Sequence, residues 1–164
     1  MGVLTDYFRA VDAASVVRAV ERTESGSPLV TTPPVFDGFE AERVDPAVVP
    51  GRLIAAVDRT EWRVDLVERT TVRPASPAPG PDGPGTEDGP WVTGPWVSEL
   101  RPLVRDALAG IHDVDVPAVV ARWVRAEELD GARADDVRPP VEEFVRLAGR
   151  PREAGDQLHC WTSL

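Results

Sequence analysis

The chain has 164 residues, of which 42% are apolar and 28% are charged, and its formal net charge is −10. This length and composition predict one globular domain over residues 1–164 that builds its own core without disulfides or metal. The negative charge argues against nucleic acid and anionic membranes as partners, because both attract arginine and lysine. It favours a protein partner with a basic surface.

The inventory of reactive side chains excludes several kinds of chemistry. All 18 basic residues are arginines, so no lysine is present to hold a phosphate in a P-loop or to form a Schiff base. Cys160 is the one cysteine, which rules out internal disulfides and paired-cysteine metal or redox sites. The lack of lysine and asparagine is typical of a GC-rich, actinobacterial genome.

The chain also lacks the patterns of an exported or membrane protein. Residues 1–8 do not combine a basic region with an apolar run, and no segment has the ~18–20 consecutive apolar residues of a membrane helix. We therefore expect a cytoplasmic protein.

The first half of the chain predicts alternating strands and helices. Residues 3–10 are rich in strand formers, and Asp12 is typical of the N-cap of a helix with an apolar face. Residues 36–44 predict a short edge strand. Pro50 and Gly51 predict a turn, followed by a helix over 51–59. The pattern at 62–66 fits a strand or a helix equally well.

The second half begins with a Pro/Gly-rich segment at about 74–90, which predicts a mobile loop. Apolar spacing then predicts helices over 98–110, 117–129 and 139–150. Residues 157–163 predict a closing strand. This order predicts an α+β fold, with helices packed on a small, mostly antiparallel sheet that includes both the N-terminal and the C-terminal strand.

Two histidine-containing segments resemble reactive sites. His112, Asp113 and Asp115 are close in sequence, but an aspartate in an inter-helix loop more often caps the next helix. His159 and Cys160 are neighbours on a predicted strand, so their side chains should point to opposite faces and cannot act as base and nucleophile together. We predict no catalytic, cofactor-binding or metal-binding residues.

Acidic and tryptophan residues are the candidates for contacts with a partner. An acidic stretch could attract a basic protein, and two of the five tryptophans flank the Pro/Gly-rich segment in the repeated motif Gly-Pro-Trp-Val. Trp123 and Trp161 are assigned to the core. The predicted partner-binding residues are Asp37, Glu40, Glu42, Asp45, Trp91 and Trp96.

The first ten residues, Met-Gly-Val-Leu-Thr-Asp-Tyr-Phe-Arg-Ala, resemble the start of the YfbM-like family of bacterial domains of unknown function. Residues 45–60, the segment from Trp91 into the following helix, and the closing Leu-His-Cys-Trp are similar to the family in order and spacing. The segment at 74–90 departs from it. The resemblance implies a single cytoplasmic α+β domain and is compatible with an immunity role. It carries over no catalytic residues.

The sequence thus predicts a non-enzymatic protein-binding domain, such as an immunity or regulatory partner. The alternative is a small-ligand binder or an enzyme that uses carboxylates and arginine. For this alternative the candidates are Asp6, Tyr7 and Arg9 on the first strand, with Asp65 or Glu68 if residues 62–72 pair with that strand. A structural component that self-associates is a third possibility, and the oligomeric state stays open.

Overall fold

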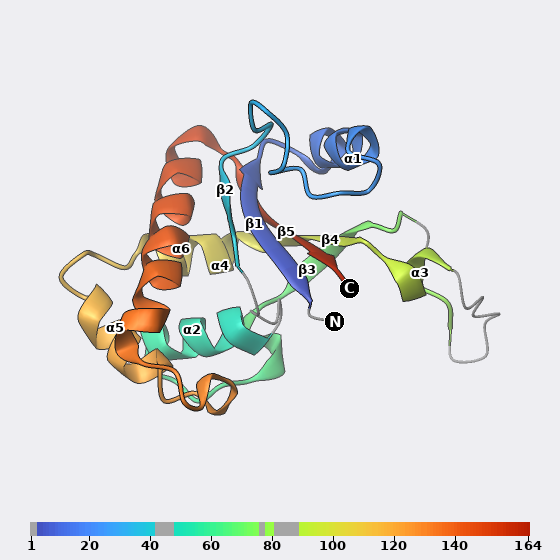
Figure 1. Cartoon of the computed structure of the whole chain (residues 1–164). Helices are drawn as coiled ribbons and strands as arrows, with labels where there is room; N and C mark the ends of the chain where they lie inside the picture. Colours follow the sequence, from blue (N-terminus) through green and yellow to red (C-terminus); the bar gives the residue numbers. More distant parts are fainter. Residues whose placement is uncertain (1–2, 42–47, 76–77, 81–88) are drawn as a thin grey trace.

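The fold is taken from a computed structural model, which describes residues 3–41, 48–75, 78–80 and 89–164. Five strands in these ranges form one antiparallel sheet in the order β2-β1-β5-β4-β3 (Figure 1). The strands nearest the two chain ends are therefore neighbours in the middle of the sheet. The strands are β1 (Leu4–Ala10), β2 (Gly38–Glu40), β3 (Arg69–Arg73), β4 (Trp96–Leu100) and β5 (Gln157–Ser163).

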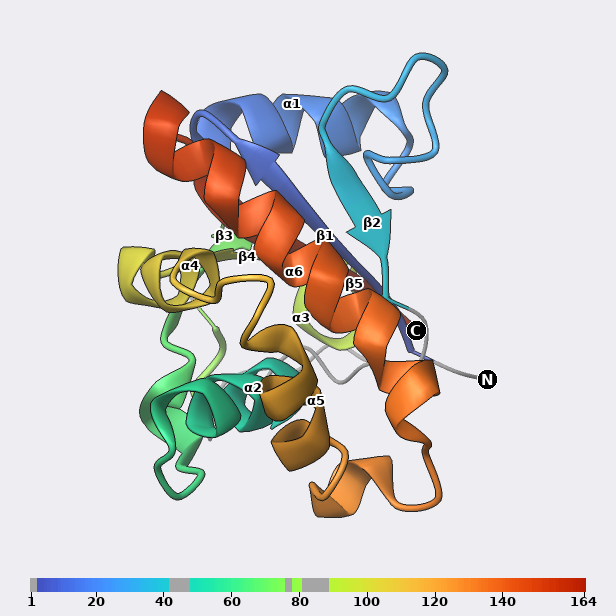
Figure 2. The same cartoon turned by 90° about the vertical axis from the view of Figure 1, so that its left-hand side faces the viewer.

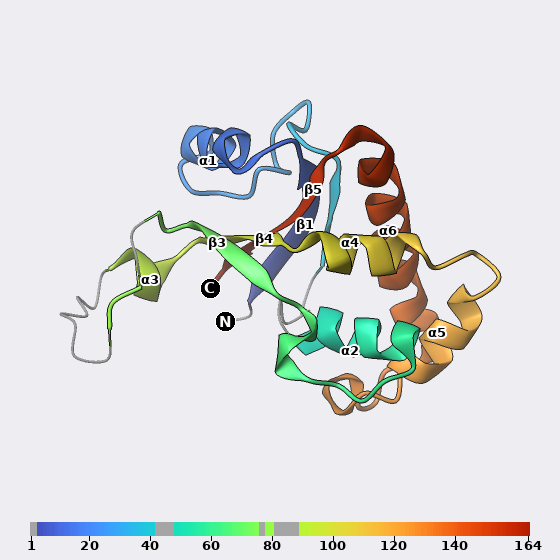
Figure 3. The same cartoon turned by 180° about the vertical axis from the view of Figure 1, so that it is seen from behind.

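The helices cover the sheet unequally. Helix α1 lies on one face, while α2, α4, α5 and α6 gather on the other, where α6 crosses the sheet beside α4 and α5 (Figure 2). The short α3 lies beyond the β3–β4 end of the sheet (Figure 3). The helices are α1 (Ala13–Arg22), α2 (Val48–Asp58), α3 (Pro90–Thr93), α4 (Pro102–Ala109), α5 (Val116–Trp123) and α6 (Ala134–Ala154), with 3₁₀ turns at Val64–Leu66 and Glu127–Leu129.

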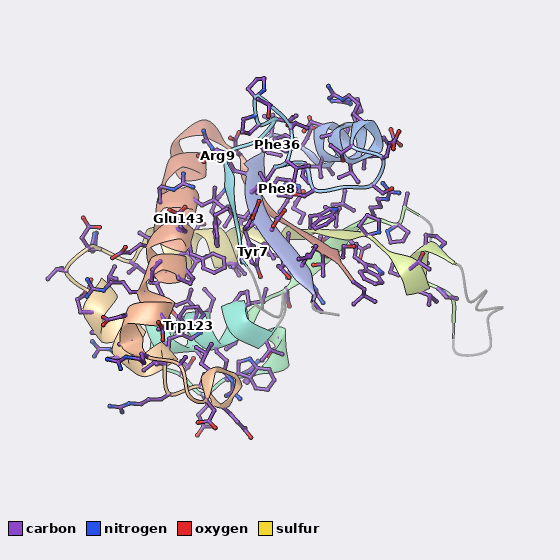
Figure 4. All side chains as sticks on the ribbon, in the orientation of Figure 1. Tyr7, Phe8, Arg9, Phe36, Trp123 and Glu143 are labelled. Carbon is purple, nitrogen blue, oxygen red and sulfur yellow. The ribbon has the colours of Figure 1, made fainter. Side chains whose placement is uncertain are left out.

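Alternation along the central strands divides the core between the two faces. Tyr7 points toward α6 and meets the ring of Phe144 edge-on, with 4.7 Å between ring centroids. Its neighbour Phe8 points to the α1 face and stacks on Phe36 at 5.2 Å (Figure 4). The face that carries Tyr7 holds the larger apolar cluster, to which four helices contribute.

The α+β fold with both terminal strands in the sheet is confirmed. The predicted helix cap is also confirmed, since the backbone N–H of Ser15 donates to Asp12 Oδ1 at 2.7 Å. Strand β2 is an edge strand as predicted, over Gly38–Glu40, and the part of that prediction beyond residue 41 lies mostly outside the described residues.

The predicted helix over 98–110 is wrong in its first part. Residues up to Leu100 belong to β4, and α4 begins only at Pro102. Proline restricts the preceding residue to an extended backbone, and Arg101 has φ −62° and ψ 150°, so the helix cannot extend further back. Leu103, in the first turn of α4, is 77% exposed.

Other helix boundaries also differ from expectation. Helix α2 already includes Val48 and carries Pro50 in its first turn, where the missing N–H has no helical partner to lose. Helix α5 ends at Trp123, and α6 begins at Ala134. The ambiguous segment 62–66 is mainly a 3₁₀ turn that leads into β3.

The short α3 was not predicted, and most of the Pro/Gly-rich segment before it lies outside the described residues. No helix in the described ranges combines the length and apolarity needed to cross a membrane.

Candidate functional site

A pocket of about 300 Å³ opens on the α1 face of the sheet, where the loop after α1 meets β1 and β2. We call it the Asp6 pocket, and its polar lining includes Thr5, Asp6, Ser27, Glu40 and Trp161. Leu4 and Val30 form an apolar rim and are 55% and 65% exposed. A polar base under an exposed apolar rim is typical of a binding site.

Ser27 reaches this pocket because the chain turns back sharply after α1. Glu24 and Ser25 have left-handed backbone conformations with φ of 52° and 75°, which reverse the chain. The Leu29 N–H donates to Ser27 Oγ at 3.1 Å, and the Ser27 hydroxyl donates to Asp6 Oδ2 in a short hydrogen bond. Gly38 permits the close approach of this loop, because a Cβ there would collide with the Tyr7 carbonyl oxygen and the Phe8 Cβ.

Asp6 and Glu40 stand directly opposite each other on neighbouring strands. The hydrogen bonds between β1 and β2 join the residues on either side, from Ala41 N–H to Thr5 O and from Arg9 N–H to Asp37 O. The pair is therefore of the non-hydrogen-bonded kind, in which facing side chains come closest. Like charges in this position are destabilising.

No arginine compensates this pair. Neither carboxylate forms an ion pair with any residue in the described part of the chain. Burial raises the pKa of Asp6, the Ser27 hydrogen bond partly lowers it again, and the charge of Glu40 raises it further. The pocket thus holds two uncompensated carboxylates in a chain that has 18 arginines.

Trp161 contributes a second unpaired group to the pocket. Its side chain lines the pocket and is only 5% exposed, and its Nε1 has no hydrogen-bond partner within the described residues. A buried N–H without an acceptor carries a free-energy cost that a bound ligand can remove. The site therefore offers two acceptor carboxylates and one donor.

Asp37, a predicted partner-binding residue, has a different role. It lies on the α6 side of the sheet, where it pairs with Arg9 at 3.4 Å and with Arg146 at 2.8 Å. Arg146 also contacts Glu143 at 2.8 Å, and Arg9 contacts Asp156 at 3.4 Å. This Asp37 cluster ties β1, the start of β2, α6 and the start of β5 together, and its carboxylate is already neutralised.

Trp91 and Trp96, predicted to contact a partner, do lie together. The Trp96 Nε1–H donates to the Trp91 carbonyl at 3.2 Å, and both indoles line a pocket of about 330 Å³ with Arg69, next to α3. Both side chains are half-buried. This pocket extends over β3, β4 and Thr162 of β5, and β1 separates it from β2, so it does not join Glu40 in one site.

Glu42 and Asp45 lie outside the described residues. The residues proposed for a small-ligand site or an enzyme around β1 do not come together in one site. Asp6 lines a pocket, but Tyr7 is buried in the core and Arg9 is held in the Asp37 cluster. Asp65 and Glu68 are not beside β1, because the following strand β3 pairs with β4 at the far edge of the sheet. The condition on which these two candidates depended, a pairing of residues 62–72 with β1, is therefore not met.

His159 and Cys160 lie on opposite faces of β5, as strand geometry predicts. His159 stacks on Phe8 at 5.7 Å, and its Nε2 lies 3.5 Å from Glu99 Oε2. Cys160 belongs to the core cluster of the other face, where burial raises the pKa of its thiol to about 11. A buried thiol that stays protonated at neutral pH is a poor nucleophile.

The segment with His112, Asp113 and Asp115 forms a turn between α4 and α5. Asp115 occupies the N-cap position of α5, as expected, but its side chain makes no capping hydrogen bond. No cluster of three or more metal-binding side chains occurs within the described ranges.

Ser27 and Trp161 were not foreseen as site residues. Each reaches Asp6 from a distant part of the sequence, and Ser27 lies in a loop without a recognisable motif. A predicted register of β1 against β5 would have identified Trp161, because this register places it opposite Asp6.

Comparisons with known proteins give no relative. No protein-family model matches the chain, and no curated protein or solved structure is significantly similar to it. The resemblance to the YfbM-like family stays a prediction.

Proposed function

We propose that this chain is a non-enzymatic protein-binding domain that accepts a cationic side chain of its partner in the Asp6 pocket. The observation that carries this proposal is the uncompensated pair of Asp6 and Glu40 at a pocket on the edge of the sheet. The repulsion between these two carboxylates destabilises the free protein, and a cation bound between them removes that repulsion.

The pocket favours an organic cation over a metal ion. Two carboxylates are fewer than the six to eight oxygen ligands that calcium takes. Leu4 and Val30 instead provide an apolar rim on which the aliphatic stem of an arginine or lysine can pack. A guanidinium matches carboxylates in a planar, bidentate geometry, so arginine is the preferred side chain.

The unpaired Trp161 N–H supports a peptide as the carrier of this cation. Every residue of an extended segment presents a carbonyl acceptor, and one such group next to the inserted side chain satisfies the indole N–H. The outward N–H and C=O groups of Gly38 and Glu40 on the edge strand are further partners for an extended chain. An immunity protein is the class of binding domain with which the YfbM-like resemblance is compatible.

The proposal is tested with two capped five-residue peptides that differ in one side chain. One carries arginine at its centre and the other citrulline, which has the same shape but no charge. Binding is followed by the ¹H–¹⁵N signal of the Trp161 indole. We expect the arginine peptide to shift this signal and to bind at least ~10-fold more tightly than the citrulline peptide.

Isosteric variants complete the test. Glu40→Gln and Asp6→Asn should each weaken binding of the arginine peptide, while Asp113→Asn, which removes an exposed carboxylate elsewhere, should not. Equal affinity for the two peptides, or equal binding by Glu40→Gln and Asp113→Asn, would exclude a cation site in this pocket.

A small organic cation is the second candidate ligand, and the enclosed polar base of Asp6, Ser27 and Trp161 favours it. Agmatine carries the guanidinium without a peptide backbone and serves as the probe. If agmatine binds as tightly as the arginine peptide, the domain is a small-ligand binder. If the peptide binds more tightly, the protein-binding function is supported.

A further inference from the structure

A cluster of arginines lies apart from the Asp6 pocket, between α2 and α5. A pocket of about 380 Å³ there is lined by four arginines, and its described lining residues include no acidic side chain. We call it the arginine pocket. Its arginines are Arg52, Arg59, Arg122 and Arg125.

Two pairs of elements bring these arginines together. Arg52 is on α2 and Arg59 directly follows it, while Arg122 is in the last turn of α5 and Arg125 follows that helix. Helices α2 and α5 pack side by side (Figure 2), so their C-terminal ends share one surface. Each end contributes about half a negative charge, which four guanidinium groups outweigh.

Three of the four arginines are not consumed by ion pairs with described residues. Arg59, Arg122 and Arg125 form none within the described part of the chain. Arg122 uses its Nε to donate to the Ala56 carbonyl at 2.6 Å, which fixes the guanidinium at the pocket and leaves its terminal nitrogens available. In a chain with a net charge of −10, arginines without carboxylate partners point to an external anion.

Trp62 forms an aromatic wall of the same pocket. The guanidinium of Arg52 lies over its ring, 4.6 Å from the ring centroid. The indole lies directly on α2, because Gly51 has no side chain and a Cβ there would be 2.9 Å from Trp62 Nε1. The wall therefore holds Arg52 in a defined position.

Arg59 is in an unfavourable backbone conformation. It follows the last residue of α2 with φ 55°, and the Thr60 N–H closes the helix on the Ala55 carbonyl at 3.0 Å. This left-handed position after a helix is the one that glycine usually occupies, since other residues are strained there. An arginine at this position, with its side chain lining the pocket, is costly for folding and is explained by binding.

We propose that the arginine pocket binds a small molecule through a phosphate or diphosphate group. Arginine forks bind phosphate oxygens in pairs, and the three arginines without an ion pair among the described residues suit a ligand with more than one negative charge. The pocket has the size of a small-molecule site and is too small for a folded partner.

The test is isothermal titration of the full chain with pyrophosphate at constant ionic strength. We expect a 1:1 complex, because the net charge repels anions from other parts of the surface. Arg59→Gly should weaken pyrophosphate binding at least ~10-fold and at the same time raise the thermal midpoint, because glycine relieves the backbone strain. Replacing an arginine with a purely structural role would not weaken binding and raise the thermal midpoint at the same time.

Further variants make the test decisive. Arg125→Gln should also weaken binding, whereas Arg18→Ala, on the exposed side of α1, should leave it unchanged. Tighter binding of a nucleoside diphosphate than of pyrophosphate would show that a nucleotide supplies the phosphate, and equal binding would assign the affinity to the diphosphate alone.

Three results would overturn the proposal. The first is the absence of pyrophosphate binding by the wild-type chain at about 1 mM ligand, a concentration that still detects millimolar affinity. The second is pyrophosphate binding by Arg59→Gly and Arg125→Gln at the wild-type affinity. The third is preference for an acidic peptide over pyrophosphate, which would assign the pocket to a different partner.

Discussion

Asp6 on β1 and Asp37 just before β2 are the same residue type, but only the charge of Asp37 is compensated within the fold. Asp37 pairs with Arg9 and Arg146 and joins four parts of the fold. Asp6, on the other face, meets the carboxylate of Glu40 and only the hydroxyl of Ser27. The charge of Asp37 is compensated within the fold, whereas the charge of Asp6 has no internal counter-charge and is available to a ligand.

This contrast shows why net charge alone does not locate a binding site. The acidic stretch that begins at Asp37 suggested a continuous surface for a basic partner. Its first member is neutralised within the fold, and Glu40 lies on the opposite face of the sheet beside a carboxylate from β1. The relevant property is the absence of an internal counter-charge.

The largest expected effect comes from supplying the missing counter-charge. Glu40→Arg places a guanidinium directly opposite Asp6, where facing side chains come closest. We expect this variant to bind the arginine peptide at least ~10-fold more weakly than wild type, because its own side chain occupies the site. Its thermal midpoint should rise. Peptide binding at the wild-type level would place the peptide elsewhere.

The second prediction removes the compensated carboxylate. Asp37→Asn leaves Arg9 and Arg146 without their shared partner, although Asp156 and Glu143 remain. We expect the free energy of unfolding to fall by about 1 kcal/mol, as for a partly buried ion-pair network. Chemical denaturation measures this change. Affinity for the arginine peptide should not change, and a loss of affinity would make Asp37 part of the binding site.

The third prediction makes the same substitution at Asp6 and expects the free energy of unfolding to rise where it falls for Asp37→Asn. Asp6→Asn removes the repulsion from Glu40 and retains an acceptor for Ser27, so the free energy of unfolding at pH 7 should rise by up to ~1 kcal/mol. Destabilisation of the size expected for Asp37→Asn would show that the Asp6 charge is compensated after all.

The pH dependence of this third effect follows from the raised pKa of Asp6. A raised pKa in the folded state means that the wild type loses stability as the pH rises through that pKa. The advantage of Asp6→Asn should therefore be present at pH 7 and vanish below the ordinary pKa of 3.8, where Asp6 is protonated in the folded and unfolded states. Denaturation curves at several pH values measure it.

The sequence predicted the parts of the fold that depend on local patterns. The Asp12 cap, strand β1 and the closing strand β5 are each indicated by a pattern of a few consecutive residues. Strand β4 was missed because the leucines at 100, 103 and 108 fit a helical spacing, and only the extended residue before Pro102 separates strand from helix.

Neither pocket was predictable from such local patterns. Asp6 was a candidate, but its pocket needs the register that opposes Glu40, the loop that delivers Ser27 and the pairing that delivers Trp161. The arginine pocket requires that two helices separated by more than fifty residues end side by side. Such long-range placement follows from tertiary packing, which a single sequence does not specify.

The most direct test of the central claim is a ¹³C NMR pH titration of the Asp6 carboxyl group, with and without the arginine peptide. An uncompensated carboxylate should have a pKa above 3.8 in the free protein, and the bound guanidinium should lower that pKa. A pKa at or below 3.8 in the free protein, or a raised pKa that the peptide leaves unchanged, would contradict the account.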